Sequence, residues 1–466
     1  MTRNHFRFQT PRYLFRKMTN QPHNTSTPLL PIGFILIGLI TPSAHGGEPL
    51  AQEYVVVHKV RDLDLPAKAV CVGTPDILQL PSGRLIASME LWLKRPTSGD
   101  EGGIDYPNHC KIKASDDGGR TWQQISTNGI TWGSLFYVNN ALHMIGNDPL
   151  KRDIRIIRSS DDGRTWSKPV TLFDDSRYHG SATPVHVKDG FVYRAFEDMD
   201  RGSASLVVAG DLSKDLLAAT AWRMSNKVEP PRDTPSLTRK AATKKDGRDS
   251  GGNWFLEGNV TEIRGELYVL LRTRIDVQLT AGLTSVCKLE DDGQTMKYRF
   301  VQFYPMPGGQ NKFKIIHDAK SSMYWTCSTL VPDPYQPAGP LADRGFAGNP
   351  GNMRRILMLS YSIDGLNWFQ AGCVAMSRNP LESFHYSSQV IVGDDLLVLS
   401  RSSIGAANRY RDYTWNSGVP SGKAKLPYNN HDSNMITLHR VKDFRALALD
   451  LRPDFKATAS DDAISE

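Results

Sequence analysis

Short apolar runs separated by Gly, Asp and Asn dominate the hydrophobic pattern of this chain. They include 83–92 (GRLIASMELW), 135–146 (LFYVNNALHMIG), 154–160 (IRIIRSS), 191–198 (FVYRAFED), 266–274 (ELYVLLRTR), 355–362 (RILMLSYS), 396–403 (LLVLSRSS) and 435–441 (MITLHRV). Helical periodicity is scarce, and the runs are bounded by turn-forming residues. Many short strands at even spacing predict an all-β sandwich, barrel or propeller.

A repeated octapeptide favours the propeller. Ser115–Trp122 reads SDDGGRTW and Ser159–Trp166 reads SSDDGRTW, and weaker copies stand at 289–296 (LEDDGQTM) and 361–368 (YSIDGLNW), which aligns Asp117 and Asp161 with Asp291 and Ile363. This spacing fits a unit of about 44–72 residues, the size of a four-stranded blade. We therefore predict a six-bladed β-propeller from about Tyr54 to Phe444, with seven smaller blades as the alternative.

The octapeptide has the composition of a tight turn. Its Asp and Ser side chains can bond the turn backbone, Gly can adopt a positive φ, and Trp can pack on a neighbouring strand. Acid–base chemistry would need the carboxylates in one place, whereas the repeat puts them in several blades. We therefore interpret the octapeptide as a structural turn.

The amino end has the pattern of an export signal. Five basic residues precede the apolar run 29–40, which is followed by small residues. The run is shorter than the ~20 residues that a membrane span needs. We predict a signal peptide over 1–46, a propeller over 47–455 and a flexible tail over 456–466. The mature protein is expected in the periplasm or outside the cell, without stable membrane insertion.

Charge and cysteine content exclude other classes. The net charge is +7, and the predicted leader carries five Lys and Arg and no Asp or Glu, which leaves +2 for the rest. A nucleic-acid-binding protein would need a clustered basic face, so no nucleic-acid partner is predicted. The five cysteines lack CxxC spacing, and neither a metal nor a cofactor is predicted.

The octapeptides resemble the Asp-boxes of the sialidase superfamily, whose fold is a six-bladed β-propeller. The resemblance covers roughly residues 55–445 and implies a glycan partner. It also implies an exported glycoside hydrolase that acts on an acidic sugar, sialic acid or a related one.

The resemblance implies roles for residues at the expected mouth of the propeller. Glu257 and Arg272 fall at the ends of paired strands, and Tyr386 stands where sialidases carry a nucleophilic tyrosine. Glu257 would activate the phenol, and Arg272 would hold the substrate carboxylate. Arg354, or its neighbour Arg355, matches a further carboxylate-binding arginine.

The sequence also departs from the sialidase pattern. Gly73 stands where the family has its first arginine, and Asp105, with Asp100 behind it, is the best match for the acid/base aspartate. The missing arginine weakens the prediction of sialic acid as the substrate.

Further polar residues are predicted at the same mouth. They are Tyr178, His179, Glu197, Lys312 and His431. A mouth rich in His, Tyr, Arg and Lys also suits a polysaccharide lyase that uses His179 and Tyr386 on uronate-containing glycans. A non-catalytic glycan-binding propeller is the third hypothesis.

Overall fold

The computed structural model describes residues 47–59, 70–93, 108–231, 254–274, 282–331, 354–379, 382–404 and 433–453. By their contacts, the residues divide into two compact units, Met1–Gly46 and Gly47–Glu466. All described residues belong to the second unit. The predicted leader and tail lie outside the described residues and stay predictions.

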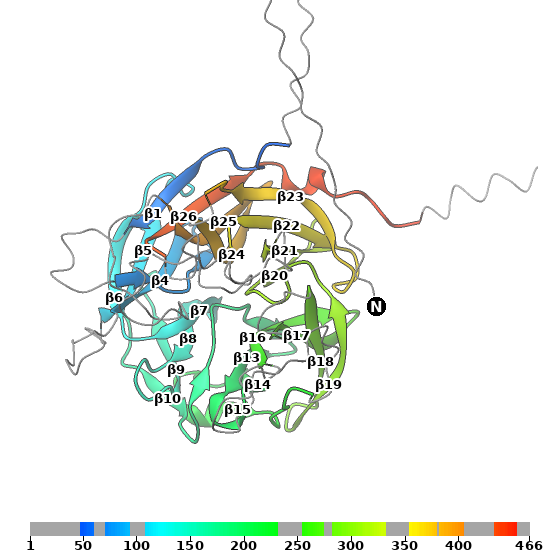
Figure 1. The fold of residues 1–466 in the computed structure, drawn as a ribbon. Helices are drawn as coiled ribbons and strands as arrows, with labels where there is room; N and C mark the ends of the chain where they lie inside the picture. Colours follow the sequence, from blue (N-terminus) through cyan, green and yellow to red (C-terminus); the bar gives the residue numbers. More distant parts are fainter. Residues whose placement is uncertain are drawn as a thin grey trace, which may run out of the picture. The chain divides into compact units, whose positions relative to one another are not determined.

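The described strands form six antiparallel sheets arranged around a centre (Figure 1). The predicted six-bladed β-propeller is thereby confirmed, and the seven-bladed alternative is wrong. Each sheet is a blade with four strand positions from the centre outward. In two blades, a pair of short strands shares the innermost position.

Blades one to three follow one another along the chain. Blade one contains β2 (Val70–Val72), β3 (Asp76–Gln79), β4 (Leu85–Leu93), β5 (Cys110–Ser115) and β6 (Gln123–Asn128). Blade two contains β7 (Thr131–Val138), β8 (Ala141–Asn147), β9 (Ile154–Ser159) and β10 (Val170–Phe173). Blade three contains β11 (Tyr178–His179), β12 (His186–Lys188), β13 (Phe191–Asp198), η3 (Met199–Arg201), β14 (Ala204–Asp211), η4 (Ala219–Ala221) and β15 (Trp222–Met224).

Blades four to six complete the ring. Blade four contains β16 (Trp254–Ile263), β17 (Glu266–Arg274), β18 (Leu283–Asp291) and β19 (Met296–Pro305). Blade five contains β20 (Lys314–Asp318), β21 (Met323–Leu330), β22 (Ile356–Ser362) and β23 (Phe369–Met376). Blade six contains β24 (Ser383–Val392), β25 (Asp395–Ser403) and β26 (Met435–Val441), followed by η6 (Phe444–Leu447). Its outer strand is β1 (Tyr54–Lys59), which pairs antiparallel with β26 and closes the ring.

The hydrophobic core is divided among the six interfaces between neighbouring blades. In β25, Leu396 and Val398 pack toward blade five, whereas Leu397 and Leu399 pack toward blade one. Successive side chains of a strand point to opposite faces, and both faces of a blade are covered. This is why the apolar runs are nearly continuous and do not alternate with polar residues.

The octapeptides form turns between the third and fourth strands of four blades. In blade two, the Asp161 carboxylate accepts hydrogen bonds from Ser159 Oγ (2.8 Å), Thr165 N (2.8 Å) and Thr165 Oγ1 (2.7 Å). Gly163 has a φ of 83°, which glycine adopts without steric cost. Trp166 Nε1 donates to Ser126 Oγ of blade one at 3.1 Å, so the turn also links two blades.

The two weaker copies differ from the predicted alignment by one residue. The carboxylates that close these turns belong to Asp292, which accepts from Thr295 N at 2.7 Å, and Asp364, which accepts from Asn367 N at 2.7 Å. Each of these Asp residues bonds the residue three positions later, whereas Asp161 bonds the residue four positions later. The weaker turns are therefore shorter, and Asp291 and Ile363 are not equivalent to Asp161.

The antiparallel strand order places all the octapeptide turns at one end of the blades. At the opposite end, which we call the mouth, the inner strands β7, β16, β20 and β24 begin and β13 ends. Side chains near the first residues of these inner strands therefore lie close to the mouth.

Candidate active site at the mouth of the propeller

Three inner strands carry a β-bulge close to the mouth. Trp132 in β7, Glu257 in β16 and Tyr386 in β24 have φ values of 52°, 56° and 49°, and the strand register shifts at each of them. A left-handed conformation is unfavourable for large side chains, and such strain is concentrated at functional sites. The bulges mark the mouth as the candidate site, in blades two, four and six.

The residue two positions after each bulge residue ties its blade to the next one. These hydrogen bonds run from Ser134 Oγ to Thr183 O (2.7 Å), from Asn259 Nδ2 to Phe313 O (3.3 Å) and from Ser388 Oγ to Asp76 Oδ1 (2.6 Å). These bonds from one blade to the next fix the bulges in place. The side chains of Trp132, Glu257 and Tyr386 therefore start from a rigid backbone.

Arg272 connects two of the predicted catalytic residues. Its Nη1 donates to Glu257 Oε2 at 3.0 Å and to Tyr386 Oη at 3.1 Å, and its Nε donates to Gln310 O at 2.9 Å. Glu257 and Tyr386 are buried, with 2% and 9% of their surface exposed. The structure thus brings together the predicted nucleophile, the predicted base and one predicted carboxylate-binding arginine.

Two more arginines lie against the Tyr386 ring. Arg354 and Arg401 have their guanidinium carbons 5.5 and 5.3 Å from the ring centroid. Arg354 Nη1 lies 2.9 Å from His385 Nδ1, and Arg355 instead donates to Ser377 O at 3.1 Å. Burial, together with the charges of Arg272 and Arg401, lowers the pKa of Arg354 to about 10. A buried anion at this place would relieve that repulsion.

Glu257 is charged despite its burial. Burial, the largest single effect, would raise the pKa of Glu257, but the charge and hydrogen bond of Arg272, together with the charges of His179 and Lys312, outweigh it, and the net pKa is lowered. Lys312 is also fully buried and donates to Ser387 O. Burial, with the nearby charge of Lys314, lowers the pKa of Lys312 to about 7. Perturbed buried groups of this kind are typical of functional sites.

His179 and Glu197 lie on the blade-three side of the mouth. His179 Nδ1 lies 2.8 Å from Glu197 Oε2, and the His179 ring packs against Trp132 with centroids 4.5 Å apart. Gly258 N donates to Glu197 Oε1 at 3.4 Å. Because Gly258 follows Glu257, the His179–Glu197 pair adjoins the predicted catalytic residues.

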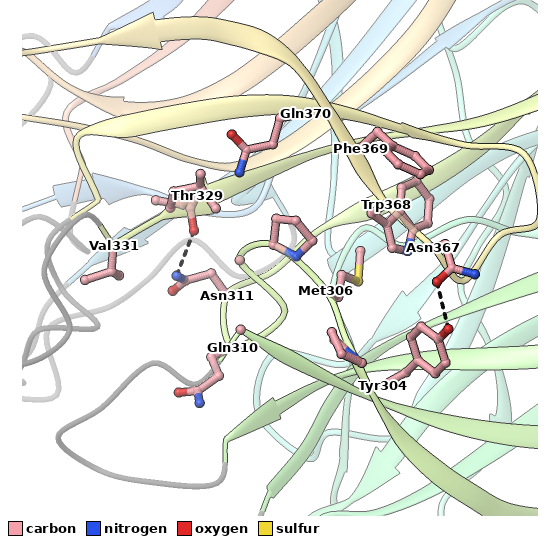
Figure 2. A pocket seen from close by; sticks show the side chains of 15 residues that line it. Tyr304, Met306, Gln310, Asn311, Thr329, Val331, Asn367, Trp368, Phe369 and Gln370 are labelled. Carbon is pink, nitrogen blue, oxygen red and sulfur yellow. Dashed lines mark hydrogen bonds between the residues drawn. The ribbon is translucent and has the colours of Figure 1, made fainter. Parts of the chain in front are cut away.

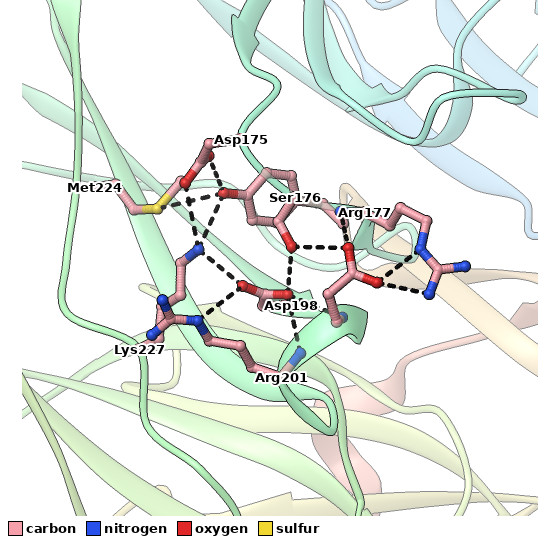
Figure 3. A network of polar contacts seen from close by, with 9 residues as sticks. Asp175, Ser176, Arg177, Asp198, Arg201, Met224 and Lys227 are labelled. Carbon is pink, nitrogen blue, oxygen red and sulfur yellow. Dashed lines mark hydrogen bonds and ion pairs between the residues drawn. The ribbon is translucent and has the colours of Figure 1, made fainter.

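Tyr178 points away from His179, as adjacent residues of a strand do. Its ring is fully buried in the core between blades two and three. Its hydroxyl bonds to Asp175 and lies 3.3 Å from Lys227 Nζ, and Lys227 Nζ donates to Asp198 Oδ2 at 2.8 Å (Figure 3). The structure therefore does not bring Tyr178 together with the other predicted residues.

Asp105 and His431 lie outside the described residues, and their predicted roles stay predictions. Sequence reasoning missed Trp132 and Arg401. Trp132 had a signal, because TWGS, LEGN and HYSS each place a large residue before two small or amide ones. Arg401 had no such signal, because the sequence does not show which arginine of a strand is buried near a site.

A cleft of about 760 Å³ lies between blades four and five (Figure 2). Its lining includes Tyr304, Gln310, Asn311, Phe369 and Gln370, and none of its described lining residues is charged. Gln310 connects the cleft to the mouth, because its carbonyl accepts the Arg272 Nε–H. The cleft thus offers aromatic and amide groups next to Arg272.

The described part of the chain gives no sign of other site types. It contains no helix long and apolar enough to cross a membrane. Nor does it gather three His, Cys, Asp or Glu side chains into a group able to hold a metal ion. Cys110, Cys287, Cys327 and Cys373 are free thiols.

No family model matches the chain, and no curated protein matches it. Similar solved structures include a protein of unknown function from Dyadobacter fermentans (13% identity, TM-score 0.50, 84% of this chain and 98% of that one). They also include an α-L-arabinanase from Penicillium chrysogenum complexed with arabinobiose (12%, 0.49, 84% and 99%) and a Trypanosoma rangeli sialidase in complex with sialic acid (14%, 0.47, 81% and 55%).

Identities this low establish the fold alone, so the site geometry has to carry any argument about activity. The chain is a six-bladed β-propeller whose fold is similar to that of sialidases and of an arabinanase.

Proposed function

We propose that the protein is an exported glycoside hydrolase of the sialidase superfamily that acts on an acidic sugar, sialic acid or a related one. The observation that carries the proposal is the setting of Tyr386. Arg272, Arg354 and Arg401 surround its ring, and Arg272 Nη1 joins its hydroxyl to Glu257. A cationic mouth of this kind suits a carboxylate, which guanidinium groups hold through paired hydrogen bonds.

The residues support a two-step reaction. Tyr386 Oη would attack the anomeric carbon while Glu257 takes the phenol proton, and Arg272 and Arg354 would hold the sugar carboxylate. A neutral nucleophile suits an anionic sugar, since a carboxylate nucleophile would be repelled by the substrate. Arg401 is fully buried, and its guanidinium carbon lies 5.3 Å from the centroid of the Tyr386 ring. It would therefore affect the reaction only through Tyr386. The uncharged cleft would take a neutral part of the glycan.

The proposal is tested by incubating residues 47–466 with sialosides and with uronate oligosaccharides. We expect release of the acidic sugar, and we expect Tyr386→Phe to lose at least about 100-fold in kcat because the nucleophile is gone. A fluorosugar that slows the second step should add one glycosyl mass to Tyr386. Tyr268→Phe is the matched control, because Tyr268 bonds Glu266 at an exposed turn away from the mouth.

Two other outcomes would overturn the proposal. An ultraviolet-absorbing product with a C=C bond conjugated to a carboxylate would identify a lyase. Binding of glycans with neither product would identify a non-catalytic propeller.

A further inference from the structure

His179 is held in one orientation from two sides. It pairs with Glu197 across β11 and β13, and its Nδ1 lies 2.8 Å from a carboxylate oxygen of Glu197, which is fully buried. Its ring rests against Trp132 at 4.5 Å. A carboxylate at Nδ1 fixes the tautomer and leaves Nε2 for exchange of a proton, as in other base–orienter pairs.

Trp132 is itself fixed by its backbone. Its N–H donates to the buried Glu90, and its carbonyl accepts from Arg194 Nη2 at 2.6 Å. On its ring, the Arg152 guanidinium carbon lies 4.9 Å from the centroid. The Trp132 ring, against which His179 packs, is therefore carried by a backbone that is hydrogen-bonded through both its N–H and its carbonyl.

A chain of contacts joins His179 to Tyr386 across three blades. It runs from His179 to Glu197 (2.8 Å), from Glu197 to Gly258 N (3.4 Å), and from Glu257 through Arg272 (3.0 Å) to Tyr386 (3.1 Å). His179 belongs to blade three and Tyr386 to blade six, and these two blades stand opposite each other in the six-bladed ring. A bound sugar would have the nucleophile on one side and His179 on the other.

We propose that His179 is the catalytic residue that gives a proton to the leaving-group oxygen and that Glu197 is its positioning residue. The Trp132 ring packs against His179 and limits its movement. This inference rests on the proposed glycosidase function, and it gives His179 the acid/base role that the sialidase resemblance implied for Asp105, which lies outside the described residues. In the first step, the C–O bond to the leaving group breaks, its electron pair goes to oxygen, and that oxygen takes the His179 Nε2 proton. The anomeric carbon bonds to Tyr386 Oη, whose proton goes to Glu257.

The second step restores every group. His179 Nε2 takes a proton from water, the water oxygen bonds to the anomeric carbon, and the bond to Tyr386 breaks. Glu257 returns its proton to the phenolate. Charged groups near His179 among the described residues include Glu197, the more distant Glu257, and Arg194, which donates to Ser181 O at 2.6 Å. The Arg152 guanidinium carbon lies 4.9 Å from the centroid of the Trp132 ring.

Glu197 is suited to holding a protonated imidazole. Burial raises the pKa of Glu197, and the charge of Glu257 adds to this increase, although the His179 bond opposes it. The single positive charge that His179 carries before the first step and regains in the second would therefore be balanced by the Glu197 carboxylate.

The leaving group tests this role, because an acidic leaving group departs without a proton. We would compare 4-nitrophenyl and alkyl glycosides of sialic acid and of glucuronic acid. His179→Ala should lose at least about 100-fold in kcat/KM on the alkyl glycoside and less than about 10-fold on the nitrophenyl one. Glu197→Gln should shift the same ratio in the same direction, but by a smaller factor, and a purely structural role would not move this ratio.

His186→Ala is the matched control, since His186 also neighbours a glutamate, Glu262 Oε2 at 3.6 Å, but lies at the turn end of blade three. It should leave both rates unchanged. Equal losses on both glycosides in His179→Ala would overturn the role of His179 and leave the glycosidase standing. No turnover of either glycoside by the wild type would overturn the proposed function and, with it, this assignment.

Discussion

Arg354 shows how one side chain is suited to a charged ligand. It is 4% exposed, lies against Tyr386 and shares its surroundings with Arg272 and Arg401. Its lowered pKa reflects burial and the positive charges of Arg272 and Arg401. A ligand carboxylate would oppose both effects, so the contribution of Arg354 should depend on the charge of the substrate.

We expect Arg354→Met to raise KM about 10- to 100-fold for the acidic glycoside, the range of a lost charge-assisted hydrogen bond. For the methyl ester of the same glycoside, KM should change little, and Arg354→Lys should recover part of the loss. Steady-state kinetics on both substrates measure this. An equal change for acid and ester would argue against a carboxylate at Arg354.

The adjacent residues Tyr178 and His179 show what sequence reasoning can and cannot give at this scale. Both were predicted at the mouth, yet neighbouring strand residues point to opposite faces, and only His179 reaches it. The two-residue period could have excluded one of them but could not say which. Trp132 could be found only by comparing the three motifs TWGS, LEGN and HYSS, and Arg401 could not be placed, because its role depends on its burial against the Tyr386 ring.

At the scale of elements, β26 carries a buried histidine at the closure of the ring. His439 is 1% exposed, pairs in register with Tyr54 of β1, and has Nε2 2.9 Å from Thr437 Oγ1. Burial lowers the pKa of His439 to about 4 from its ordinary 6.5. The folded protein therefore favours the neutral ring. The stability that this ring contributes is present in full above pH 6.5 and is lost as the pH falls through 4.

A shift of this size corresponds to about 3 kcal/mol of unfolding free energy across that window. When the pH falls from 7.5 to 4, we expect the free energy of unfolding of His439→Gln to fall by about 3 kcal/mol less than that of the wild type. This difference should hold whatever the stability of the variant at pH 7.5. Urea unfolding at the two pH values gives the comparison. His317→Gln, at an exposed position, should keep the wild-type dependence, and a His439→Gln variant that does the same would refute the assignment.

The octapeptide shows how much of the element arrangement was predictable. Its two strong copies placed turns correctly, because Asp161 and Thr165 must meet for the turn to close. The weaker copies were misaligned by one residue, since Asp292 and Asp364 close shorter turns. Turn length is a property of the backbone path, and a degenerate motif does not record it.

At the scale of the whole molecule, the ring is held by the pairing of β1 with β26. The strand β1 also buries Val57 between blades six and one. Without β1, the edge of β26 would expose unpaired backbone groups, which promote association with other chains.

We therefore expect a variant that lacks residues 47–59 to self-associate and to lose cooperative thermal unfolding. Light scattering after size exclusion, together with a thermal melt, measures both properties. A variant that lacks residues 454–466 is the control and should behave as the full chain does. A monomeric 47–59 deletion with the parental melting curve would show that the ring does not depend on this pairing.

The three bulges in alternate blades have a consequence for how such a protein could change its chemistry. Trp132, Glu257 and Tyr386 stand at matching backbone positions, each anchored by a bond from its own blade to the next. A single substitution at any of them would alter what faces the bound molecule and leave those anchors in place. New specificities could therefore evolve, or be selected in the laboratory, by exchanging three side chains on an otherwise unchanged ring.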